Sequence, residues 1–78
     1  LSPSPGAWFQ YKGERYKVLR GVKSSKIGKP GHVVDKNLTV ACKSYSIKIL
    51  EIQRQGKKKQ SITEFLLGKK IDIGVSLN

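Results

Sequence analysis

The stretch SIKILEIQRQGKKKQSITEFLLG, residues 46–68, decides the fold, because the period of its apolar residues changes along it. Its first part, SIKILEIQ, is the longest strand that the sequence predicts. Ile47 and Ile49 share one strand parity, whereas Leu50 falls on the other. A bulge or sharp bend between Ile49 and Leu50 would restore a single apolar face, and bends of this kind curl small sheets into barrels.

The second part, SITEFLLG, has the pattern of a short helix. Ser61 can accept a hydrogen bond from the backbone N–H of Glu64, whose carboxylate can reach back to form a capping box. Ile62 and Phe65 then lie on one side, and Gly68 is the expected C′ residue. A helix of two turns is not stable alone in water, so we expect it to dock on the sheet.

Shorter strand patterns surround this stretch, separated by turn residues. A polar loop is predicted from Gly21 to Gly31, where Pro30 and Gly31 suit a type II turn. The remaining predicted strands are AWFQY, RYKVLR, HVVD, LTVAC and IDIGV, at 7–11, 15–20, 32–35, 38–42 and 71–75. This spacing favours a mainly β fold: a small five- to six-stranded antiparallel barrel that resembles the oligonucleotide-binding fold, with one short helix.

Composition indicates one small domain with a polyanionic partner. The chain has 78 residues, with 16 Lys and Arg against five Asp and Glu, a net charge of +11. So large a charge opposes compaction, and nucleic acid is the natural ligand that would neutralise it. Residues 1–6, LSPSPG, read as the end of an interdomain linker, and residues 7–78 as the domain.

Catalytic and metal-binding patterns are missing from the sequence. One cysteine and one histidine cannot supply a four-ligand zinc site, and no phosphate-binding loop or dinucleotide fingerprint occurs. We expect Cys42 to be a buried apolar residue and His32 a loop residue without a catalytic role. No membrane span or signal peptide is visible, so we expect a cytoplasmic, non-catalytic domain that binds no cofactor itself.

The basic residues therefore carry the functional prediction. Blocks of one charge sign in turns and on exposed strand faces suit a phosphate backbone. The candidate contacts are Arg15, Lys17, Lys26, Lys29, Lys48, Arg54, Lys57, Lys58 and Lys59. Among the aromatic residues, Trp8, Tyr16 and Phe65 are assigned to the core, while Tyr11 and Tyr45 are left open between core and base stacking.

Most of the chain, roughly residues 3–77, resembles the C-terminal domain of methionyl-tRNA formyltransferases. The resemblance is carried by SPSPGAWF, RYKVLR, GKPGHVVD, LTVAC and above all IKILEIQRQGKKKQSITEFLLG. It implies a small barrel that helps to hold initiator tRNA. It also implies a separate N-terminal catalytic domain, which binds 10-formyltetrahydrofolate and transfers its formyl group. Lys57 and Lys58 match the family's Gly-Lys-Lys and Lys17 the lysine of its first hairpin, whereas Ser4 replaces a common tryptophan.

We thus expect a monomeric domain that binds initiator tRNA through its phosphates, beside an N-terminal catalytic domain and away from membranes. An autonomous basic RNA-binding or ribosomal protein remains an alternative, which would stack bases on exposed aromatic rings. The C-terminal piece of a related formyltransferase that does not act on tRNA would have no reason to be so basic. A protein–protein adaptor would need an exposed apolar patch.

Overall fold

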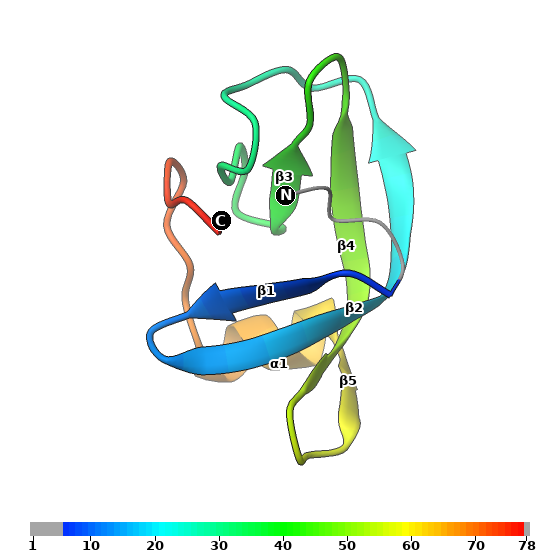
Figure 1. Cartoon of the computed structure of the whole chain (residues 1–78), viewed down its shortest axis with the longest axis vertical. Coiled ribbons are helices and arrows are strands. Elements are labelled where there is room, and N and C mark those ends of the chain that lie inside the picture. The colour runs from blue at the N-terminus through cyan, green and yellow to red at the C-terminus, as the bar shows by residue number, and fades with distance from the viewer. Residues whose placement is uncertain (1–5, 78) are drawn as a thin grey trace.

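The computed structural model describes residues 6–77, in which an antiparallel sheet curls into a half-barrel beside one short helix (Figure 1). The predicted mainly β fold is confirmed, and the arrangement is consistent with a small barrel like the oligonucleotide-binding fold. Most of the predicted linker, residues 1–5, lies outside the described residues. The elements are β1 (Trp8–Tyr11), β2 (Glu14–Ser24), β3 (Thr39–Ala41), β4 (Ser46–Arg54), β5 (Lys59–Ser61) and α1 (Ile62–Gly68).

The sheet is organised around β4. One edge of β4 pairs with β2 along nearly its whole length, while β3 pairs with its first half and β5 with its second half. β1 pairs with the start of β2, so the strand order is β1-β2-β4-β3, with β5 beside β4. The connection between β3 and β4 and the hairpin of β4 and β5 consequently lie at opposite ends of the molecule's longest axis (Figure 1).

The expected irregularity in β4 lies where the apolar parity changes. Val18 pairs with Ile52, Arg20 with Glu51 and Gly21 with Ile49, so the ladder skips Leu19 of β2 and Leu50 of β4 and then resumes its earlier register. Ile49 and Ile52 are both fully buried as a result, although an alternating strand would place them on opposite faces. The predicted irregularity at Ile49 and Leu50 is confirmed, although one residue of each strand leaves the ladder and β4 has no net extra residue.

β2 continues to Ser24, so the sequence prediction of a loop starting at Gly21 is wrong for residues 21–24. Gly21 is a site of close packing. A Cβ atom there would lie 2.7 Å from Cγ2 of Ile47 and 3.3 Å from the carbonyl oxygen of Lys48. Glycine therefore lets the two strands approach, and the ladder continues as far as the pair of Ser24 with Ser46.

Two turns have the backbone geometry that their glycines require. Lys12 and Gly13 both have positive φ, 51° and 81°, which matches the type I′ turn of a two-residue hairpin. Gly31 has φ of 83°, and the N–H of His32 donates to the carbonyl oxygen of Lys29 at 3.0 Å. This is the pattern of a type II turn with proline before glycine, as predicted.

The strands predicted at 32–35 and 71–75 are wrong, since only isolated bridges form, at His32 and Val33 in the first segment and at Ser76 just after the second. The first segment ends in a turn because the carboxylate of Asp35 accepts backbone N–H groups of the residues that follow it. The second is interrupted by Gly74, whose φ of 93° turns the chain. The two segments still lie together, because the N–H of Gly74 donates to the carbonyl oxygen of Val33 at 2.8 Å.

α1 begins as the sequence predicts and ends differently. Ser61 is the N-cap, and its hydroxyl oxygen accepts the N–H of Glu64 at 3.1 Å. Gly68 is the last helical residue rather than C′. The C-cap is Lys69, which is extended at φ −140° and donates its N–H to the carbonyl oxygen of Phe65 at 3.0 Å. The helix therefore stops without a left-handed residue, and the chain leaves it in an extended conformation.

Aromatic packing forms the centre of the core. The ring of Tyr16 stacks on Phe9 at 5.3 Å and meets Phe65 edge-on at 5.2 Å, and all three side chains are buried. The core positions predicted for Tyr16, Phe65 and Cys42 are confirmed. The prediction for Trp8 is wrong, because Trp8 is 37% exposed. Neighbouring strand residues point to opposite faces, and it is Phe9 that points inward.

Candidate nucleic-acid interface

One row of side chains crosses four strands at the end of the sheet where β4 finishes. The register pairs Lys17 of β2 with Trp8 of β1 and with Gln53 of β4, and Gln53 in turn pairs with Lys59 of β5. Directly opposed residues share a face of the sheet, and the exposure of Trp8 identifies this face as the outer one. Arg15 lies two positions before Lys17, on the same face. We call these five residues the outer row.

Two cations of the outer row are held beside its aromatic ring. The guanidinium carbon of Arg15 lies 4.5 Å from the centre of the Trp8 ring, and Nζ of Lys17 lies 5.9 Å from it. Both distances are within the range of cation–π attraction. The Trp8 ring therefore positions two positive charges at the surface, where each can also attract a phosphate.

The hairpin of β4 and β5 carries the lysine cluster of the GKKK stretch. The N–H of Lys57 donates to the carbonyl oxygen of Arg54 at 2.9 Å, and Gly56 has φ of 79°, as a tight turn requires. The side-chain amide of Gln53 donates to the carbonyl oxygen of Lys57 at 2.8 Å and braces the turn. Lys59, predicted in a loop, is instead the first residue of β5. These contacts hold several cations on one ordered protrusion.

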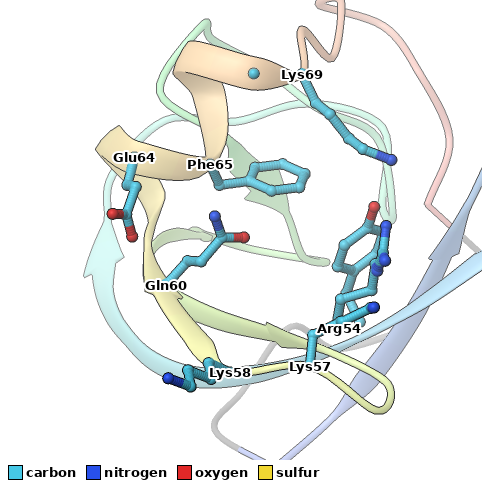
Figure 2. A pocket seen from close by; sticks show the side chains of 9 residues that line it. Arg54, Lys57, Lys58, Gln60, Glu64, Phe65 and Lys69 are labelled. Carbon is cyan, nitrogen blue, oxygen red and sulfur yellow. The ribbon is translucent and has the colours of Figure 1, made fainter.

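A pocket of about 410 Å³ lies beside this hairpin, bounded by β4, β5 and the C-terminal end of α1 (Figure 2). We call it the barrel-mouth pocket. Its lining includes the basic residues Arg54, Lys57, Lys58 and Lys69. Glu64 also borders it, but Figure 2 shows the Glu64 carboxylate across the pocket from the Lys69 amine. The charged part of the pocket lining is therefore mainly basic.

Lys69 is a residue of this site that the sequence reasoning missed. Its amine lies 5.9 Å from the centre of the Tyr16 ring. A basic residue directly after a predicted helix is a local signal, because cations are favourable at a helix C-terminus. Its approach to Arg54, however, depends on how α1 docks on the sheet. We call the seven basic residues gathered here the cationic end: Arg15, Lys17, Arg54, Lys57, Lys58, Lys59 and Lys69.

The structure places the other three predicted contacts elsewhere. The amine of Lys26 donates to the Asp35 carboxylate at 2.7 Å, so much of its charge is already neutralised. Lys29 lies in the type II turn close to β3, and Lys48 lies on β4 opposite Val22. The cationic end has its own partial neutralisation, since Nε of Arg54 lies 3.7 Å from a Glu14 carboxylate oxygen.

The Asp35 carboxylate is the acidic group whose pKa the fold changes most clearly. Burial alone would raise the pKa of Asp35, but hydrogen bonds from Lys26, from Thr39 and from the N–H of Asn37 outweigh it and lower the pKa to about 2. The group therefore stays ionised and joins the start of the loop after β2 to the turn before β3. Its role is structural.

Metal-ligating side chains do not gather anywhere in residues 6–77. No group of three or more His, Cys, Asp or Glu residues in this range could hold a metal ion. Nδ1 of His32 lies 3.1 Å from the carbonyl oxygen of Pro30, a contact within its own turn. The same residues include no helix long and apolar enough to cross a membrane.

Comparison with known proteins gives a consistent set of relatives. Residues 1–70 match the family model described as formyl transferase, C-terminal domain. The methionyl-tRNA formyltransferase of Pelagibacter ubique is 53% identical over 72 residues, covering 91% of this chain and 23% of that protein. The enzyme of the same name from Paramagnetospirillum magneticum is 42% identical over 77 residues, covering 99% and 25%. That of Rhodopseudomonas palustris strain BisB5 is 44% identical over 78 residues, covering 95% and 25%.

The chain spans about a quarter of the length of these curated relatives. The family match, in contrast, covers most of the chain itself, including β1 to β5 and α1. The resemblance seen in the sequence is thereby confirmed: this chain belongs to the family of formyl transferase C-terminal domains.

Proposed function

We propose that this chain is the tRNA-binding domain of a methionyl-tRNA formyltransferase and holds initiator tRNA through its phosphate backbone. The observation that carries the proposal is the cationic end, where seven of the 16 basic residues gather around the start of β2 and the hairpin of β4 and β5. A protruding, ordered group of cations can contact several phosphates of a nucleic-acid backbone at once.

The greater length of the relatives supports a separate catalytic domain. The similar proteins are named as methionyl-tRNA formyltransferases and are about four times longer. We therefore propose that formyl transfer from 10-formyltetrahydrofolate takes place on an N-terminal catalytic domain. The present domain increases the lifetime of the tRNA complex without taking part in the reaction.

A salt-dependent titration of the 78-residue chain with initiator tRNA tests the proposal. If about five cations contact phosphates, the slope of log K against log salt is roughly −3.5 to −4.5. Raising salt from about 50 to 200 mM then lowers the affinity by two to three orders of magnitude. Elongator tRNA binds nearly as well, because phosphate contacts carry no sequence information. A flat slope would refute the proposal.

Charge reversal at two different places shows whether tRNA affinity depends on a local interface or only on the net charge of the chain. The double variant Lys57→Glu, Lys58→Glu reverses the charge at the tip of the β4–β5 hairpin. The double variant Lys29→Glu, Lys43→Glu makes the same charge change at exposed positions near the other end of the sheet. We expect the first pair to lower the affinity more than tenfold and the slope by about two units. Equal losses for both pairs would show that only net charge matters.

A further inference from the structure

A buried hydroxyl group lines the barrel-mouth pocket without a hydrogen-bond partner. Tyr16 is 1% exposed, and within residues 6–77 its hydroxyl is the buried side-chain polar group that has no partner. Buried polar groups are nearly always paired, and leaving one unpaired costs about 1–3 kcal/mol. Because Tyr16 also lines the barrel-mouth pocket, a ligand in that pocket is the natural partner.

Two charged groups placed beside Tyr16, those of Arg54 and Lys69, can only donate hydrogen bonds. Arg54 is directly opposite Tyr16 in the β2–β4 ladder, and the amine of Lys69 lies 5.9 Å from the Tyr16 ring centre. Guanidinium and ammonium groups carry no acceptor, so neither can accept the tyrosine proton. Three kinds of donor therefore face one space, and a group rich in acceptor oxygens would satisfy all of them.

The aromatic rings of the pocket are not free to stack on a base. Tyr16 is packed between Phe9 and Phe65, with ring centres 5.3 Å and 5.2 Å away. Phe65 itself is only 4% exposed. On the side away from Glu64, the pocket consequently offers donors and positive charge but no open ring face, which favours an oxyanion over a nucleobase.

We propose that the barrel-mouth pocket binds one phosphate group, with the hydroxyl of Tyr16 donating to a phosphate oxygen while Arg54 and Lys69 neutralise its charge. Lys69 is the C-cap residue of α1 and has a long, flexible side chain. Its amine can therefore move from the Tyr16 ring to the anion. The phosphate belongs to the RNA backbone if the proposed function holds. Free inorganic phosphate has the same chemistry and is the other possible source.

The test titrates the 78-residue chain with inorganic phosphate at constant ionic strength, following backbone amide shifts by NMR. Tyr16→Phe removes only the hydroxyl, and we expect about tenfold weaker phosphate binding. Its thermal stability should be unchanged or higher, because the free chain leaves that hydroxyl unpaired. Lys69→Met should weaken binding similarly, whereas Lys70→Met, at the exposed neighbouring position outside this pocket, should not. Equal phosphate binding by the parent chain and all three variants would refute the proposed phosphate site.

A parallel tRNA titration identifies the source of the phosphate. Weaker tRNA binding by Tyr16→Phe, relative to the unchanged chain, supports an RNA phosphate in the pocket. If Tyr16→Phe loses inorganic phosphate but binds tRNA as before, the pocket stands as a free-phosphate site and its link to RNA is refuted. If the chain binds phosphate but no tRNA at any salt concentration, the proposed function fails while the pocket remains.

Discussion

The guanidinium group of Arg15 lies over the ring of Trp8, 4.5 Å from its centre, although the sequence suggested that this tryptophan belongs in the core. The two residues come from adjacent strands, β1 and β2, and share the outer face of the sheet. Trp8 is the one tryptophan of the chain, so its fluorescence reports directly on the outer row.

Binding of tRNA should change the fluorescence of Trp8. A phosphate that attracts Arg15 draws the guanidinium away from the ring and alters its surroundings. We expect an emission change on adding tRNA that high salt reverses. Arg15→Gln should weaken binding about threefold to tenfold and lower the salt slope by about one unit.

Lys12→Gln is the control for this experiment, since it removes one cation from the tip of the same hairpin. It should leave the salt slope and the Trp8 signal nearly unchanged. If tRNA binds without any change in Trp8 emission, the outer row is not part of the interface. A large quench with short single-stranded RNA would instead favour the base-stacking alternative.

Gly56 and Gly68 should respond oppositely to alanine. Gly56 has φ of 79° in open space, so alanine there meets only backbone strain, which costs about 1–2 kcal/mol. Gly68 is helical and equally open, so alanine should stabilise α1 by up to about 1 kcal/mol. Urea unfolding measures both. A Gly56→Ala protein as stable as the parent would mean that the hairpin turn tolerates another conformation.

The features that sequence predicts correctly are those decided within a few residues. The change of apolar parity between Ile49 and Leu50 requires a break in the regular alternation of β4, whatever strand lies alongside. Ser61 caps α1 because its hydroxyl is three residues from the N–H that it accepts. Gly56 supplies the positive φ of the hairpin in the same local way.

The features that sequence misses depend on distant partners. Residues 59–61 are polar and resemble a loop, but the backbone of Gln60 finds a ladder partner in Ile52. Gly21 looks like a strand breaker until Ile47 is placed against it. The barrel-mouth pocket is unpredictable for the same reason, because Lys69 reaches Tyr16 only through the docking of α1.

Removing the cap of α1 should destabilise the whole domain. Ser61→Ala loses the hydrogen bond from the N–H of Glu64, at a cost of about 1 kcal/mol. The loss should appear as a lower melting temperature without a change in strand pairing. Ser25→Ala, in the exposed loop after β2, is the matched control and should melt like the parent. Equal melting temperatures for Ser61→Ala and Ser25→Ala would contradict the proposed contribution of the Ser61 cap to stability.

Acid should selectively remove the contribution of Asp35. Its folded-state pKa is lowered to about 2 from an ordinary value of 3.8, so ionised Asp35 stabilises the fold above about pH 4. That contribution is lost as pH falls from about 4 to 2, when the carboxylate is protonated. Allowing for solvent screening, we expect it to be on the order of 1 kcal/mol.

Asp35→Asn tests this by comparing stability with the parent chain at several pH values. The difference should be constant near neutral pH, shrink between about pH 4 and 2, and vanish below that range, because both chains then lack the charge that attracts Lys26. Asp72→Asn, at an exposed turn position, removes a carboxylate away from this contact and is the control. A stability difference for Asp35→Asn that stays constant down to pH 2 would show that the ion pair with Lys26 does not stabilise the fold.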